Sequence, residues 1–269
     1  MFHFRSISET RLALLRTQAY QSLSAPLDGM WDDIIHRSAI KGIFYQTECI
    51  GYFSYDASYT LIYFYVTDPW LNRKREVLRT LLQDEYMPQA YVGTNHPCFL
   101  NAALLLSYGA SVYYYLFEDQ PDAQQMFSLP EAYQKATFQL SGVDDINAIV
   151  KFCLRTSSAD KNWLADYTRY WVARRGIYCL VLDKKILGTC ELRKSEAQAG
   201  IADLGAIVSP RHRKKGLGTY LMLRGKALCY EQGLQPICSC RYDNQGSRRM
   251  IEKAGFVNRH NLLKVKFKI

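Results

Sequence analysis

A short stretch between an apolar run and a helical pattern combines two glycines with four cationic side chains. The apolar run at residues 204–208 predicts a short buried strand, and the helical periodicity that follows stops at Gly233. The turn between them contains Arg211, Arg213, Lys214, Lys215, Gly216 and Gly218. A glycine-containing turn that opens a helix leaves backbone N–H groups unpaired, adds the positive end of the helix dipole and lets an anion approach closely. The turn therefore predicts a phosphate site, the alternative being an ordinary solvated basic corner.

Two other glycine-rich phosphate motifs fit this stretch less well. A Walker A loop needs Ser or Thr after Gly-Lys, and here Gly225-Lys226 is followed by Ala227. The first glycine of that motif is also missing, because Tyr220 stands in its place. A dinucleotide-binding fingerprint needs a small residue where Leu221 stands, and more chain than follows.

The spacing of the turn resembles a known cofactor loop. Arg213-x-x-Gly216-x-Gly218, preceded by Val208-x-Pro210, is similar to the acetyl-CoA pyrophosphate loop of the GNAT (Gcn-related N-acetyltransferase) superfamily. The resemblance covers residues 138–269 well. It implies acetyl-CoA contacts from Ala206, Ile207, Val208, Arg213, Lys214, Lys215, Gly216, Leu217, Gly218, Thr219, Asn244 and Ser247. Asn is also a favoured helix N-cap, so both roles stay open for Asn244.

The same resemblance implies direct acetyl transfer to an amine, with a backbone N–H near Val208 facing the thioester carbonyl. An amine has an ordinary pKa near 10, so a carboxylate would help to remove its proton. Asp203, at the start of the central strand, is the first candidate for this base, and Glu191 on the preceding strand is the second. Either side chain could instead be a solvated charge at a strand end.

One position departs from the family pattern. Many GNAT enzymes have a tyrosine seven residues after the Asn, as acid to the leaving thiolate, and this chain has Ile251 there. Thiols have pKa values near 8.5, so the thiolate can leave without an acid. Tyr242 is the candidate substitute.

Composition points to an anionic partner. The chain has 269 residues and a net charge of +9, which nucleic acid, a membrane surface or a phosphorylated cofactor would explain. Outside residues 211–215 the charge is diffuse, so a cofactor is preferred, with neither nucleic acid nor membrane as partner. A hydrophobic content of 48% excludes general disorder. No apolar run reaches about 20 residues and residues 1–5 show no signal segment, so a cytoplasmic location is predicted.

The eight cysteines are scattered singly apart from Cys238-x-Cys240. That pair falls on a predicted strand, and no second Cys or His pair completes a zinc site. Reduced, buried thiols and no metal are predicted.

The order of elements predicts an α/β (α+β) fold built from two GNAT-like copies. Each half reads as two helices, a hairpin, a strand, a helix, a strand, a short helix and a strand, which is the GNAT order. The resemblance implies a mixed, mostly antiparallel sheet with splayed central strands. Residues 118–130 are the best linker, giving a degenerate domain at 1–130 and a catalytic domain at 136–269. The first copy has no glycine in its phosphate turn, residues 70–75, and an unrelated α/β domain is the alternative there.

Together these features predict an acetyl-CoA-dependent N-acetyltransferase that acts on the primary amine of a small molecule, as a monomer or homodimer. One CoA is expected per chain, with the first half helping to wall the acceptor site. Two alternatives remain open. The chain could be a non-catalytic sensor or interaction module that binds acyl-CoA, or an N-acetyltransferase of proteins or peptides.

Overall fold

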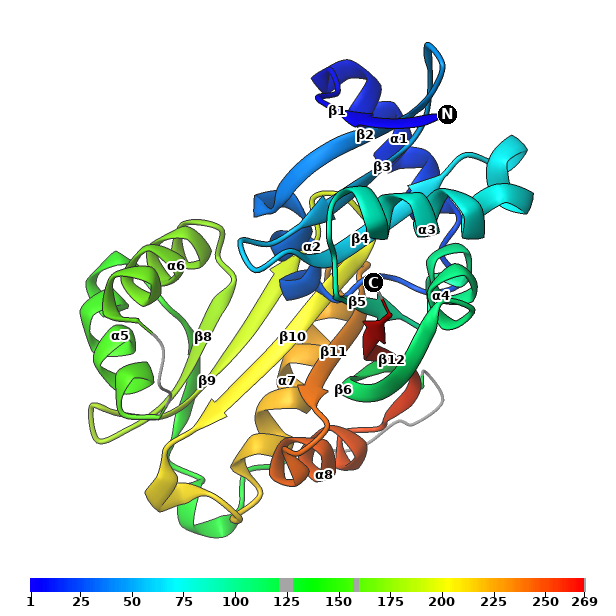
Figure 1. The fold of residues 1–269 in the computed structure, drawn as a ribbon. Coiled ribbons are helices and arrows are strands. Elements are labelled where there is room, and N and C mark those ends of the chain that lie inside the picture. Colours follow the sequence, from blue (N-terminus) through cyan, green and yellow to red (C-terminus); the bar gives the residue numbers. More distant parts are fainter. Residues whose placement is uncertain (121–127, 157–159, 269) are drawn as a thin grey trace. The chain divides into compact units, whose positions relative to one another are not determined.

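The computed structural model describes residues 1–120, 128–156 and 160–268, and these form two compact units (Figure 1). Unit 1 comprises Met1–Leu116, Ser239–Asp243 and Asn258–Ile269, and unit 2 comprises Phe117–Cys238 and Asn244–Val257. Each unit is a mostly antiparallel sheet with helices packed on it. The predicted mixed α/β class is confirmed.

Unit 1 has its strands in the order β1-β2-β3-β4-β5-β12-β6. Its elements are β1 (Phe2–Arg5), α1 (Glu9–Gln21), α2 (Gly29–Arg37), β2 (Ala39–Tyr45), β3 (Glu48–Tyr55), β4 (Thr60–Val66), the 3-10 helix η1 (Asp68–Arg73), α3 (Lys74–Asp84), β5 (Gln89–Gly93), α4 (Pro97–Leu104) and the first part of β6 (Ser107–Asp119). Every residue of β4 is buried. One core lies against α3 and α4 and another against α1 and α2, so both faces of this strand are covered.

Unit 2 has its main strands in the order β11-β10-β9-β8-β7. Its elements are β7 (Thr137–Leu140), α5 (Ile146–Leu154), α6 (Lys161–Ala173), β8 (Ile177–Leu182), β9 (Lys185–Lys194), β10 (Ile201–Val208), the 3-10 helix η4 (Pro210–His212), α7 (Leu217–Glu231), most of β11 (Gln235–Arg241), α8 (Gln245–Lys253) and the start of β12 (Phe256–Phe267). A core of α5 and α6 residues covers one face of β8 and β9, and α7 packs on the other.

The C-terminal strand β12 completes unit 1. It pairs antiparallel with β5, from Leu262 opposite Gly93 to Lys266 opposite Gln89. Val265 is fully buried in the core of unit 1, which gives this segment a packing reason to belong there. The predicted domains, 1–130 and 136–269, are consecutive segments, whereas neither compact unit is a single stretch of the chain.

The two central strands of each unit separate after a short parallel pairing. In unit 2, β10 pairs with β11 only over residues 201–203, while it pairs with β9 as far as Val208. In unit 1, β4 pairs with β5 only over residues 60–61. The predicted splay of the central strands is confirmed in both units. Within the described part of the chain, no helix combines the length and apolar character needed to cross a membrane.

Candidate active site

The edge of β10 that splays from β11 carries the first part of the candidate site. The Ser209 N–H donates to the Leu187 carbonyl at 2.9 Å, on the side of β9. Because backbone groups alternate in an antiparallel pair, Ile207 also directs its backbone groups toward β9. Ala206 and Val208 direct theirs to the opposite, splayed edge. An extended pantetheine arm would therefore find backbone partners on Ala206 and Val208.

The turn after β10 brings the chain into α7 through two left-handed residues. Lys214 has φ of 59° and Gly216 has φ of 83°. Glycine adopts this conformation without strain, and a Cβ at Gly216 would also lie 3.3 Å from the Cγ of Pro130. No side chain caps α7 at Gly216, its N-cap residue. The N–H groups of the first turn of α7 thus lack a side-chain acceptor, which is what a phosphate site requires.

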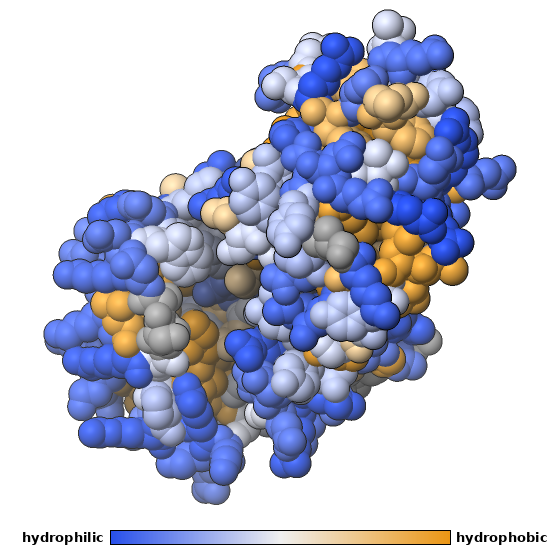
Figure 2. All heavy atoms as spheres, in the orientation of Figure 1, coloured by the Kyte–Doolittle hydropathy of each residue, from blue (hydrophilic) through white to orange (hydrophobic). Residues whose placement is uncertain are grey.

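The cations of this turn are exposed and unbalanced. Arg211, Arg213, Lys214 and Lys215 are all solvent-exposed. Over the residues that the structure covers, none of the four forms an ion pair with a carboxylate. The Arg213 Nε donates to the Val208 carbonyl at 3.1 Å, which ties the turn to the end of β10. Figure 2 shows hydrophilic residues at the end of unit 2 where this turn lies. This unpaired positive charge fits a phosphorylated cofactor.

The first turn of α7 contains three further residues that were predicted to contact the cofactor, Leu217, Gly218 and Thr219. Leu217 is buried and anchors the helix on the core of unit 2. Thr219 is half-buried. A Cβ at Gly218 would lie 2.5 Å from the Sδ of Met250 on α8. Gly218 therefore has a packing role between α7 and α8, in addition to any contact with a phosphate.

Asn244 is the N-cap of α8. Its Oδ1 accepts the backbone N–H of Ser247 at 3.1 Å, so the predicted capping role is present. Asn244 is exposed and Ser247 is half-buried. Their predicted contacts with the cofactor stay predictions.

The two candidate bases lie in one buried network. Arg193 on β9 has its Nη2 2.7 Å from the Asp203 Oδ2 and its Nη1 2.9 Å from the Glu191 Oε2. The Tyr167 hydroxyl on α6 donates to the Glu191 Oε2 at 2.6 Å and accepts from the Arg193 Nη1 at 3.0 Å. A Cβ at Gly205 would lie 3.4 Å from both Arg193 and Glu191, so glycine leaves room for the cluster. Two carboxylates thus share one guanidinium.

The surroundings determine the protonation states of Arg193 and Tyr167. Burial alone would lower the pKa of Arg193, but the carboxylates of Asp203 and Glu191 raise it well above its usual value. Burial raises the pKa of Tyr167, and the charge of Glu191 raises it further. Arg193 is therefore cationic and Tyr167 keeps its proton. Asp203 is only 1% exposed, and the side chain of Glu191 is 12% exposed.

Sequence reasoning singled out neither Arg193 nor Tyr167 as a site residue. The spacing Glu191-x-Arg193 puts both side chains on one face of a strand. Antiparallel pairing then brings Asp203 directly opposite Arg193. The alternation was readable in the sequence, but the register that adds Asp203 was not.

The role of Tyr242 as substitute acid stays a prediction. Tyr242 follows β11 in unit 1, is 51% exposed, and its backbone N–H donates to the Tyr113 carbonyl at 3.1 Å. Ile251 on α8 is buried and belongs to the packing of unit 2. The eight cysteines are free thiols, and all but Cys49 are buried. In the described ranges, no three His, Cys, Asp or Glu side chains gather so as to hold a metal.

Comparison with known proteins agrees with this geometry. One family model, described as an acetyltransferase (GNAT) domain, matches residues 8–120. Another, the acetyltransferase (GNAT) family, matches residues 144–256. No curated protein matches the chain.

Several solved structures share the fold along the whole chain. A GNAT-family acetyltransferase from Colwellia psychrerythraea has a TM-score of 0.91 at 22% identity, covering 99% of this chain and 100% of that chain. A GCN5-related N-acetyltransferase from Sphaerobacter thermophilus has a TM-score of 0.68 at 15% identity, covering 99% of this chain and 95% of that chain. A tandem GNAT protein from the clavulanic acid biosynthesis pathway has a TM-score of 0.66 at 15% identity, covering 98% of each. The chain belongs to the GNAT acetyltransferase family and carries two GNAT domains in tandem.

Proposed function

We propose that unit 2 is an acetyl-CoA-dependent N-acetyltransferase that transfers the acetyl group directly to the primary amine of a small molecule. The observation that carries the proposal is the continuity of the open edge of β10 with an uncapped, basic helix N-terminus. One element offers backbone partners to an extended arm, and the next offers N–H groups and charge to phosphates.

The residues present fit the cofactor. Ala206 and Val208 would hold the pantetheine arm through their backbone groups, and the turn from Arg213 to Thr219 would hold the pyrophosphate. Asn244 would contact the arm with the part of its side chain that does not cap α8. When bound, acetyl-CoA supplies an acetyl group activated as a thioester.

Glu191 is the proton acceptor that the network favours. Its Oε2 receives hydrogen bonds from Tyr167 and Arg193, which hold the carboxylate in one orientation. Asp203 is more deeply buried and forms a close ion pair with Arg193. We therefore assign Asp203 to positioning Arg193 and Glu191 to accepting the amine proton, which reverses the preference drawn from sequence.

The test is thiol release from acetyl-CoA by the purified full chain across a panel of small primary amines. Each positive amine is checked by mass spectrometry for one added acetyl group. The proposal expects at least one amine to raise thiol release well above hydrolysis, and Glu191→Gln to remove that increase while CoA affinity is unchanged.

A second function, acyl-CoA binding without turnover, is favoured by one observation. The position of the usual leaving-group acid is occupied by Ile251, which is buried and apolar. Tight binding of CoA in calorimetry, with no thiol release for any small amine or peptide amine, would establish this second function instead.

A further inference from the structure

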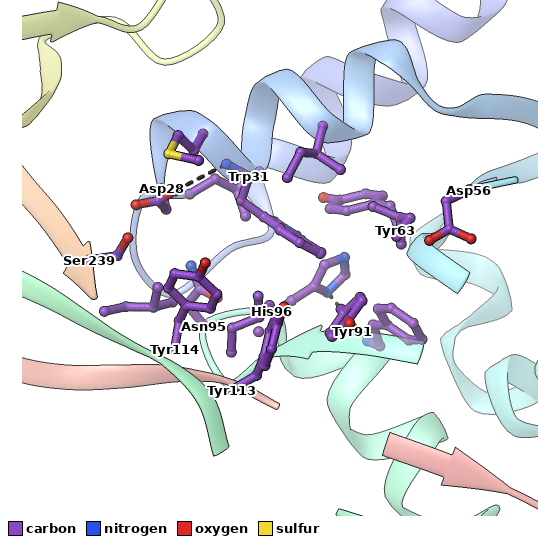
Figure 3. A pocket seen from close by; sticks show the side chains of 18 residues that line it. Asp28, Trp31, Asp56, Tyr63, Tyr91, Asn95, His96, Tyr113, Tyr114 and Ser239 are labelled. Carbon is purple, nitrogen blue, oxygen red and sulfur yellow. Dashed lines mark hydrogen bonds between the residues drawn. The ribbon is translucent and has the colours of Figure 1, made fainter. Parts of the chain in front are cut away.

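Unit 1 contains a cavity of about 230 Å³ that the catalytic proposal does not use (Figure 3). All of its lining residues belong to unit 1, including Ser239 of β11 and Leu262 of β12. Six aromatic side chains line it, namely Trp31, Tyr63, Tyr91, Phe99, Tyr113 and Tyr114. The cavity is thus an aromatic chamber within one compact unit.

The rings of the chamber are held by one another. Trp31 and Tyr91 meet edge to face with centroids 5.4 Å apart, and Tyr91 stacks on Tyr113 at 4.8 Å. Such pairs are rigid, and the faces of Trp and Tyr rings carry negative electrostatic potential. A wall of this kind attracts an organic cation more strongly than a neutral molecule of the same shape.

The charges of the lining have the same sign. Asp28 and Asp56 contribute carboxylates, and the described lining residues include neither lysine nor arginine. Asp28 is 9% exposed, and its Oδ1 accepts the backbone N–H of Trp31 at 3.0 Å, which fixes it at the start of α2 (Figure 3). The lining therefore has a formal charge of −2 when His96, its one further titratable group besides the tyrosines, is neutral.

Two cations lie near the outer rings. The Lys264 Nζ is 6.0 Å from the centroid of Tyr91, and the Arg241 guanidinium is 6.0 Å from that of Tyr113. Arg241 is paired with Asp243 at 2.8 Å, so its charge is balanced. Neither side chain lines the cavity, and the carboxylates there remain in excess.

A buried donor in the chamber has no partner within the described protein. The His96 Nδ1 accepts the backbone N–H of Phe99 at 3.3 Å, so the ring proton lies on Nε2. His96 is 2% exposed, and burial lowers its pKa to about 4, which keeps it neutral at pH 7. Among the residues that the structure describes, its Nε2 has no hydrogen-bond partner. In Figure 3 the imidazole lies among the rings of the chamber.

A buried acceptor lies next to it. The Asn95 Nδ2 donates to the carbonyls of Ala25 and Pro26, at 3.2 and 2.9 Å, which fixes the orientation of the amide. The Asn95 Oδ1 is left without a partner in the described part of the chain. A Cβ at Gly93 would lie 2.2 Å from this oxygen, so glycine at this position leaves room for the Asn95 amide. Buried polar atoms without a partner require an explanation, and a polar ligand in the cavity would supply one for both groups.

We propose that this chamber binds a small organic ammonium ion that also carries a hydrogen-bonding oxygen. The rings and the carboxylate of Asp28 hold the cation, and the Nε2–H of His96 donates to the oxygen. The site lies in the copy that lacks the phosphate turn, and it does not depend on acetyl transfer by unit 2.

Choline is the probe, and 3,3-dimethylbutan-1-ol, its uncharged carbon isostere, is the matched ligand. Binding of both to the full chain is measured by calorimetry without acetyl-CoA. Choline has no N–H, so its nitrogen cannot accept an acetyl group, and its binding tests the chamber separately from catalysis. We expect choline to bind at least tenfold more tightly than the isostere. Equal binding of the two, or no binding of choline, overturns the proposal.

A pair of isosteric variants locates the site. Asp28→Asn removes the charge, while Asn still caps α2 as well as Asp does, and choline binding should weaken about tenfold. Asp33→Asn makes the same change on the exposed face of α2, where Asp33 pairs with Arg37, and should leave choline binding unchanged. Equal effects of the two variants, or a choline affinity that Asp28→Asn leaves intact, contradict the assignment.

Discussion

The two units send their central strands into corresponding turns, but only the turn of unit 2 is left open to an anion. In unit 1, β4 leads through η1 into α3, and side chains of this turn pack against aromatic rings of neighbouring strands. Trp70 packs on Tyr45 at 4.8 Å. The Arg73 guanidinium lies 5.1 Å from the rings of both Phe2 and Tyr45, and Glu76 binds it in a bidentate pair.

The difference shows that strand splay alone does not create a cofactor site. In unit 2 the turn has Gly216 in a left-handed conformation and cations without carboxylate partners within the described chain. In unit 1 no residue between 67 and 75 has a positive φ, and the charge of Arg73 is neutralised by Glu76. The backbone frame is shared, whereas the shaped set of N–H groups and the free charge are not.

The two units also differ in the residue at which their central strands separate. The last β10 residue that pairs with β11 is Asp203, while the last β4 residue that pairs with β5 is Leu61. Asp203 belongs to the acid network, and Leu61 to the apolar core of unit 1. A buried carboxylate therefore marks the point of separation in unit 2, and an apolar side chain marks it in unit 1.

The largest expected effect concerns the acid network. Glu191→Gln should lower kcat/KM about 100-fold and flatten the rate–pH profile, because the proton acceptor is lost while the hydrogen bonds of Tyr167 can persist. Glu196→Gln, which removes an exposed acid paired with Arg174, is the matched control and should have no effect.

Asp203→Asn should behave differently. It leaves Arg193 without its closest partner, so the free energy of unfolding should fall by about 3 kcal/mol while CoA affinity is retained. If this variant flattened the rate–pH profile and Glu191→Gln did not, the two roles would be exchanged.

The next expected effect is a loss of folding stability at acid pH that originates in unit 1. An unfolded His takes up a proton below pH 6.5, but burial keeps His96 neutral until about pH 4. Lowering the pH through this window therefore favours the unfolded state, by roughly 3 kcal/mol in total. His96→Asn, which retains a cap for α4, should remove this loss in urea unfolding at pH 7 and pH 4.5. His212→Asn, in unit 2, should leave the loss in place.

The sequence predicted the fold well where local pattern determines it. The glycine turn, the following helix and the N-cap at Asn244 all depend on residues close together in the chain. The splay was predicted from the resemblance to a family. The exchange of β12 into unit 1 was not predicted, because its apolar residues Val265 and Phe267 would suit the core of either unit.

The cavity of unit 1 was beyond sequence reasoning for a related reason. Its aromatic residues come from α2, β4, β5, α4 and β6, and each one alone is typical of a strand or helix core. His96 was not singled out, because a lone histidine ahead of Pro97 has no spacing to other residues that indicates a site. Only the register of the strands brings these rings together around two carboxylates.

A smaller effect is expected at the left-handed glycines. Gly216→Ala and Gly233→Ala place the same strain at the two ends of α7, with φ values of 83° and 67°, and each should cost about 1 kcal/mol of stability. Only Gly216→Ala should also weaken CoA binding, roughly tenfold, because it disturbs N–H groups that face the phosphates. Calorimetry with CoA checks this, and equal affinities of the two variants would place the phosphates elsewhere.

The smallest effect distinguishes the two arginines that follow the central strands. Arg213 has no carboxylate partner in the described chain and is tied to the Val208 carbonyl, so its charge is available to a phosphate. Arg213→Ala should weaken CoA binding about fivefold at low salt, and the difference should shrink as ionic strength rises.

Arg73→Ala should leave CoA binding unchanged, because Glu76 and the rings of unit 1 already engage that guanidinium. Its thermal unfolding should nevertheless shift downward, since the stacked contacts are lost. A second CoA bound per chain, removed by Arg73→Ala, would show that the turn of unit 1 also holds phosphates and would end the distinction between the two units.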